Sequence, residues 1–295
     1  MDVLSPPPSR FSPETRLGII IRVAFFIATV LIGMAVFPRA ILSGFGPIIA
    51  STCGLLATGL VANWLTLRVF DRQPLRDAGL PGGRASLHNF LIGIVFSVVT
   101  AGLMLGLPLL AGGGHLVPHA HAHAPVGSVA FFFLLLLCGA AGEETIFRGY
   151  AFQFLVDKIG PFATVLPVAV IFGFAHSSNP HASVLGIVNT VIWGFVLGYA
   201  FLRSHDLWFP IGLHYGWNFA LPLFGTTLSG LTIDVTRYSY RWDLSPLWSG
   251  GAYGPEGGVL TTIFAIALGF ALSRAPVAPQ RAAVAKSLND VFSDL

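Results

Sequence analysis

The sequence has few charged residues. Only 10% of its 295 residues are Asp, Glu, Lys or Arg, whereas soluble globular chains carry about 25%. So few charges do not cover the surface of a soluble protein of this length, and the mean hydropathy is high, at +0.76. This composition excludes a soluble enzyme and a disordered chain.

Two other features are scarce or absent. The basic residues are scattered rather than gathered into a stripe, which excludes nucleic acid as a partner despite a net charge of +3. The only cysteines, Cys53 and Cys138, lie in apolar runs. They do not form the framework of a disulfide-rich protein, and we interpret them as small core residues.

Long apolar runs are abundant. A helix needs about 20 apolar residues to cross a bilayer, and the first run is too long for a cleaved signal peptide. The pattern predicts an all-α fold, a polytopic membrane helix bundle of about eight transmembrane helices. Their expected ranges are 17–37, 40–64, 88–111, 127–150, 161–178, 185–203, 206–224 and 257–273.

The basic residues predict the orientation. Of 16 Lys and Arg residues, eleven fall on one side of the eight runs and three on the other, with Arg22 and Arg148 inside runs. We therefore expect a cytoplasmic segment 1–16, a bundle 17–273 in the lipid bilayer, and a cytoplasmic tail 274–295 with a short, mobile surface helix. The Gly- and Ala-rich chain with mostly short loops is typical of a bacterial inner (plasma) membrane protein.

Two adjacent carboxylates, Glu143 and Glu144, lie well inside one run. A charge at mid-membrane costs roughly 2.5–3.5 kcal/mol, so such residues usually face the bundle interior and carry function. Arg148 follows Glu144 by four residues, the spacing of an ion pair on one helix face. Glu143 points about 100° away from Glu144, which leaves it free for chemistry.

Two histidines and an asparagine are expected close to these carboxylates. Glu143 lies 17 residues before the predicted turn at Gly160, and His176 lies 16 residues after it, so both have nearly the same height. His214 and Asn218, four residues apart, share a helix face in the seventh run. We expect these side chains to form one site.

Such a site is suited to amide hydrolysis. A carboxylate and an imidazole activate water, and a second imidazole and an amide donate hydrogen bonds to the oxyanion. Glu143, His176 and His214 are also a His-His-Glu set suited to a catalytic zinc, which leaves a metalloprotease open. A third reading is a membrane transporter or scaffold with Glu143 and His176 as a proton relay.

Three motifs in order resemble the CAAX protease and bacteriocin-processing family (CPBP/Abi) of intramembrane endopeptidases. They are Glu143-Glu144-x-x-x-Arg148, Phe172-x-x-x-His176 and His214-x-x-x-Asn218, and the resemblance covers residues 127–224. It implies a CAAX-prenyl-protease-like enzyme with Glu143 and His176 activating water. His214 and Asn218 would form the oxyanion site, and Glu144 and Arg148 the supporting pair.

The remaining expectations concern partners and loops. We expect no cofactor, with zinc as the alternative, and a peptide or membrane-protein substrate, because bacteria as a rule lack prenylated CAAX proteins. The aromatic-rich loop 225–256 is expected at the membrane interface. The last expectation is a low-complexity outer loop, whose histidines are His115, His119, His121 and His123.

Overall fold

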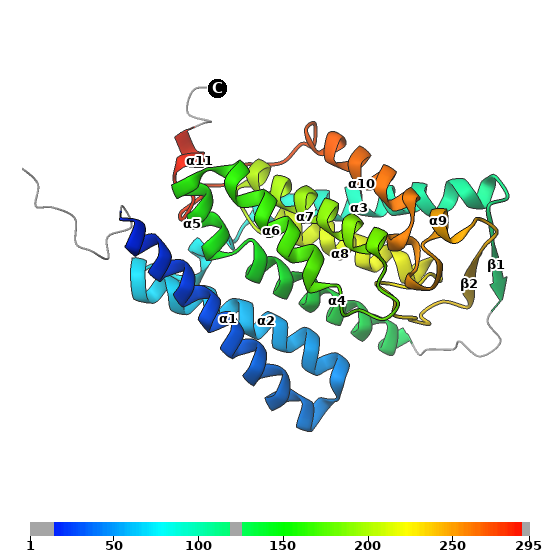
Figure 1. Ribbon diagram of the computed structural model, residues 1–295, viewed down its shortest axis with the longest axis horizontal. Coiled ribbons are helices and arrows are strands. Elements are labelled where there is room, and N and C mark those ends of the chain that lie inside the picture. Colours follow the sequence, from blue (N-terminus) through cyan, green and yellow to red (C-terminus); the bar gives the residue numbers. More distant parts are fainter. Residues whose placement is uncertain (1–14, 119–125, 291–295) are drawn as a thin grey trace, which may run out of the picture.

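The computed structural model describes residues 15–118 and 126–290, which form a helical bundle (Figure 1). The N-terminal pair is α1 (Arg16–Phe45) and α2 (Pro47–Thr66), continued by the π-helical turn η1 (Leu67–Asp71) and the 3₁₀ turn η2 (Leu75–Ala78). The longer helices that follow are α3 (Arg84–Leu110), α4 (Val126–Phe147), α5 (Tyr150–Ile159), α6 (Pro161–Ala175), α7 (Val184–Ser204), α8 (Trp208–Leu223) and α10 (Val259–Leu272).

Each of the eight predicted runs is helical, in agreement with the predicted all-α membrane bundle. Within the described residues, five helical segments are long and apolar enough to cross a membrane: Arg16–Leu42, Pro47–Asp71, Arg84–Leu110, Val129–Ile159 and Val184–Ser204. The other three, α6, α8 and α10, have 15, 16 and 14 residues. At 1.5 Å per residue such helices reach only about 21–24 Å, less than a hydrocarbon core of about 30 Å. They are short because the chain turns at their ends into polar loops.

The outward-facing apolar side chains of the bundle are suited to contact with lipid. Leu31 and Phe162 are 65% and 93% exposed, and many other large apolar residues of the helices are exposed as well. Soluble proteins rarely expose contiguous apolar surface on this scale. Together with the five long apolar helices, this makes the protein an integral membrane protein.

The packing order of the helices places α4 and α8 at the centre. The α1–α2 pair packs through α2 on α4, α4 packs on α8, and α8 packs along α3, while α6 lies along α7. The contact between α3 and α8 is close because Gly212 has no side chain. A Cβ atom there would lie 2.1 Å from the carbonyl oxygen of Phe90. Small residues at such contacts are typical of membrane helices.

Residues 225–256 form a cover at one end of the bundle. The segment contains β2 (Tyr238–Trp242), α9 (Pro246–Ser249), η3 (Gly251–Tyr253) and η4 (Pro255–Gly257). Strand β2 pairs antiparallel with β1 (Gly114–Pro118), at the end opposite α5 and the short C-terminal helix α11 (Ser287–Asp290) (Figure 1). Among its aromatic residues, Tyr240 is buried and its hydroxyl donates to the carbonyl of Leu105, whereas Tyr238 and Trp248 are exposed.

The described residues of the C-terminal tail pack on the bundle and contain a short helix, as the sequence predicts. Ala278 exchanges hydrogen bonds with the side chain of Asn89, and Ala282 and Ala285 are buried. The short helix α11 (Ser287–Asp290) begins where the backbone N–H of Ser287 donates to Asp157 of α5. Small residues let this segment approach the helices closely.

Candidate active site

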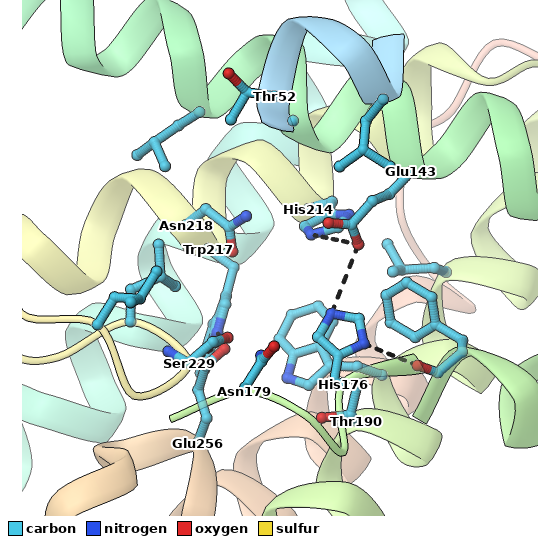
Figure 2. A pocket seen from close by; sticks show the side chains of 18 of the residues that line it. Thr52, Glu143, His176, Asn179, Thr190, His214, Trp217, Asn218, Ser229 and Glu256 are labelled. Atoms are coloured by element: carbon cyan, nitrogen blue, oxygen red, sulfur yellow. Dashed lines mark hydrogen bonds and ion pairs between the residues drawn. The ribbon is translucent and has the colours of Figure 1, made fainter. Parts of the chain in front are cut away.

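The central cavity has a volume of about 330 Å³ and is lined by all four residues proposed for catalysis from the sequence (Figure 2). Glu143 comes from α4, His176 follows the last residue of α6, and His214 and Asn218 come from α8. The cavity lies toward the covered end of the bundle, since its wall includes Leu228, Ser229 and Glu256 of the segment 225–256. The structure thus brings the three sequence motifs together.

Glu143 faces both imidazoles without touching either. Its Oε2 atom lies 3.7 Å from Nε2 of His176 and 3.9 Å from Nε2 of His214. These separations exceed a hydrogen bond, and Oε2 is buried with no hydrogen-bond partner among the described residues. One water beside such a pair of atoms can form a hydrogen bond to each of them.

The second ring nitrogens fix which atoms face Glu143. Nδ1 of His176 lies 2.8 Å from the carbonyl oxygen of Phe172, and Nδ1 of His214 lies 2.9 Å from Oε1 of Glu144. Both partners only accept, so each Nδ1 carries the proton and donates it. In the neutral rings, each Nε2 therefore presents a lone pair toward Glu143, and three acceptors converge on one space. That arrangement requires a donor or a cation between them.

Glu144 and Arg148 form the ion pair that their spacing predicts. Their side chains are 0% exposed, and Nη1 of Arg148 lies 3.2 Å from Oε1 of Glu144. Arg148 also donates to the carbonyl of Gly194 in α7 and lies over the Phe172 ring, 4.6 Å from its centroid. Because Glu144 binds His214 as well, the pair links α4, α6, α7 and α8 around the cavity.

A break in the helix follows directly after these charges. Helix α4 ends at Phe147 and α5 begins at Tyr150. Asn63 of α2 bridges the break, because its amide donates to the carbonyl of Thr145 and its oxygen accepts the N–H of Tyr150. These bonds satisfy backbone groups that the break would leave unpaired inside the bundle. They hold the C-terminal end of α4 against α2.

Sequence reasoning missed part of the cavity wall. Asn179, Asn189, Ser229 and Glu256 line it beside Trp217. Glu256 directly precedes the predicted run 257–273 and is the last residue of the predicted interfacial loop 225–256. Its position next to an apolar helix start was the available signal, but its contact with α8 depends on how residues 225–256 fold.

The donor atoms of Glu143, His176 and His214 suit zinc in chemistry, but the separations of Glu143 from the two histidines are wider than a zinc site has. Within residues 15–118 and 126–290, no group of three His, Cys, Asp or Glu side chains is arranged to hold a metal ion. Tetrahedral zinc ligands about 2.0–2.1 Å from the metal lie roughly 3.3 Å apart. The Glu143–histidine separations are somewhat wider than this, although the donor set is one that zinc prefers. In the outer loop, His115 pairs with Asp243, while His119, His121 and His123 lie outside the described residues.

A family model matches the part of the chain that contributes these side chains. The model described as type II CAAX prenyl endopeptidase, Rce1-like, matches residues 125–220. This part of the chain is therefore similar to that family. The match confirms the resemblance indicated by the motifs, and no curated protein matches the chain.

The Rce1-like region is about a third of the 295 residues and runs from the start of α4 to within α8. It contains all seven motif residues, including Glu143 and both histidines that face it. The match implies an intramembrane endopeptidase. Helices α1 to α3, the cover and the tail lie outside the match.

Proposed function

We propose that the protein hydrolyses a peptide bond of a peptide or membrane-associated protein, using a water held between Glu143, His176 and His214. The observation that carries the proposal is the convergence of three acceptor atoms at the wall of one cavity. A water fits there because it donates two hydrogen bonds and still presents a lone pair to a carbonyl carbon.

Each step of the reaction has a group to move its proton. Glu143 Oε2 accepts a proton from the water as the oxygen attacks the carbonyl carbon, and His176 Nε2 orients the water. Glu143 then returns the proton to the amide nitrogen as the C–N bond breaks. The products are a carboxylic acid and an amine, and no covalent enzyme intermediate forms.

The oxyanion is stabilised from α8. The Asn218 amide lines the cavity one helical turn beyond His214. His214 donates to the same oxygen once its Nε2 has taken up a proton from solvent, while Glu144 accepts its Nδ1–H and stabilises the imidazolium. Donors fixed in advance on one helix need little reorganisation as charge develops.

The decisive test is Glu143→Gln, which keeps the volume of the side chain and removes the base. Cleavage of a peptide library by purified protein in detergent should be abolished, while the melting temperature stays close to that of the wild type. Asp243→Asn is the matched control, because this carboxylate is half-exposed and bonded to His115. Full activity of Glu143→Gln would contradict the mechanism.

A zinc endopeptidase is the second candidate, because the same three acceptor atoms are a carboxylate oxygen and two imidazole nitrogens. Elemental analysis of the wild type and His176→Ala distinguishes the two, since losing one of three ligands releases most of the metal. We expect no stoichiometric zinc in the wild type and activity that survives chelation. One zinc per chain, lost in His176→Ala, would establish the metalloprotease instead.

A further inference from the structure

The cavity contains a second carboxylate that the proposed reaction does not use. Glu256 belongs to η4, directly before α10, and lines the cavity together with Glu143. In the close view it lies beside Ser229, across the cavity from Glu143 (Figure 2). It therefore lies beyond the place where the water is held.

Neutral donors hold this carboxylate in place. Oε1 of Glu256 accepts from the indole Nε1 of Trp217 at 3.0 Å, and Oε2 accepts from the backbone N–H and the hydroxyl of Ser229. Trp217 precedes Asn218 on α8, so the carboxylate is anchored next to the proposed oxyanion donor. Both oxygens keep lone pairs for a further donor.

No cation of the described chain compensates this charge. Glu256 takes part in none of the ion pairs within residues 15–118 and 126–290, and no Lys or Arg of that part lines the cavity. The guanidinium nearest in sequence to the catalytic carboxylate, Arg148, is already paired with Glu144. The other ionisable groups facing the cavity are Glu143, His176 and His214. An uncompensated carboxylate in a partly desolvated cavity attracts a positive group strongly.

We propose that Glu256 determines substrate specificity by accepting the ammonium or guanidinium group of a substrate Lys or Arg next to the scissile bond. The inference rests on the proposed function and names its substrate class. A substrate with an acidic residue or a free carboxyl terminus at the same position would place two negative charges together. The cavity selects against such a substrate.

The competing role for Glu256 is purely structural, as an anchor for the segment 228–231 that covers the cavity. The two roles respond differently to Ser229→Ala. Ser229→Ala removes one hydrogen bond to the Glu256 carboxylate and keeps its negative charge. Glu256→Gln removes the negative charge and keeps nearly the same side-chain shape.

The experiment compares kcat/KM for two peptides that differ only in Lys or norleucine beside the scissile bond. Wild type should favour the Lys peptide by about 10- to 100-fold, the range of one hydrogen bond to a charged group. Glu256→Gln should bring the ratio close to one, while Ser229→Ala should keep it. Asp234→Asn, a change of an exposed carboxylate in the same loop, should also keep it.

Equal rates for the two peptides in the wild type, or an unchanged ratio in Glu256→Gln, would overturn the inference and leave the proposed function standing. A ratio lost equally in Ser229→Ala would assign Glu256 the anchoring role. Binding of the same peptides with an uncleavable reduced bond supplies an arm independent of catalysis. If no peptide is cleaved, the proposed function fails, and tighter binding of the Lys peptide by wild type than by Glu256→Gln still supports the cation site.

Discussion

At the residue scale, Glu143 and Glu144 are adjacent but have opposite surroundings. The Glu144 side chain is fully buried between Arg148 and His214, while that of Glu143 is 22% exposed and has one oxygen without a partner. The 100° step of the helix sends one carboxylate into a network and the other into the cavity. Two identical side chains can therefore serve a structural and a chemical purpose.

Asn218→Ala is expected to lower kcat by roughly 10²–10³ with little change in KM. An oxyanion donor stabilises charge that develops only in the transition state, so its loss leaves substrate binding almost intact. Steady-state kinetics on one good peptide substrate measure the split. A raised KM with unchanged kcat would mean that Asn218 binds the substrate rather than the oxyanion.

Glu144→Gln and Arg148→Met should each destabilise the protein by about 3–5 kcal/mol, because each leaves a buried charge without its partner. The double variant should recover part of that loss, since no unpaired charge remains. It should stay inactive, because the carboxylate that orients Nδ1 of His214 is absent. Thermal unfolding in detergent tests this cycle, and additive losses in the double variant would show that the two charges are not coupled.

At the element scale, the break between α4 and α5 fixes where the catalytic end of α4 lies. Asn63→Leu should lower the melting temperature and the activity together, because the Thr145 carbonyl and the Tyr150 N–H lose their partner. Each orphaned group costs about 1–3 kcal/mol. Thr66→Val is the control, since the hydroxyl of this buried residue of α2 bonds only to Ala62 of its own helix. Equal effects of the two variants would contradict a special role for the bridge.

The turn between α7 and α8 contains a pH-dependent group. Burial raises the pKa of Asp206 from 3.8 to about 6, against the opposing hydrogen bonds from Asn89 and the N–H of Phe209. At a pH between these two pKa values, Asp206 binds more protons in the folded state than in the unfolded state. The stabilisation that this protonation provides therefore decreases as the pH rises from about 4 to about 6. The melting temperature of wild type relative to Asp206→Asn should fall across that window and then level off. A constant difference from pH 4 to pH 7 would show that Asp206 is not shifted.

The sequence predicts local relationships well and long-range ones poorly. Helix periodicity is sufficient for the Glu144–Arg148 pair, and Gly160 with a positive φ followed by Pro161 forms the predicted turn. The bond from His214 to Glu144, the bridge by Asn63 and the place of Glu256 join residues 39 to 87 positions apart. Such contacts depend on how whole helices pack, which no local pattern encodes.

At the scale of the whole molecule, the bundle is charged unequally at its two ends. The end with α5, α11 and the tail contains Asp157, Lys158, Arg281 and Lys286 around one polar cavity. Arg22, inside α1, belongs to this end too, since its guanidinium pairs with Asp71 at 2.6 Å and donates to the hydroxyl of Tyr150. The opposite end has the β1–β2 pair and the cover over the candidate active site (Figure 1).

This asymmetry leads to the last prediction, on topology. Because Lys and Arg are retained on the cytoplasmic side, we expect the tail in the cytoplasm and the cover on the outer side, with the candidate active site nearer the outer side. Single cysteines replacing Asp234 in the cover and Arg281 in the tail, both exposed, test it in a background without Cys53 and Cys138. A membrane-impermeant maleimide should label position 234 in intact bacterial spheroplasts and position 281 only after lysis. The reverse labelling pattern would show that the protein has the opposite orientation, with the cavity toward the cytoplasm. A cytoplasmic peptide would then reach Glu143 from the side of the cover.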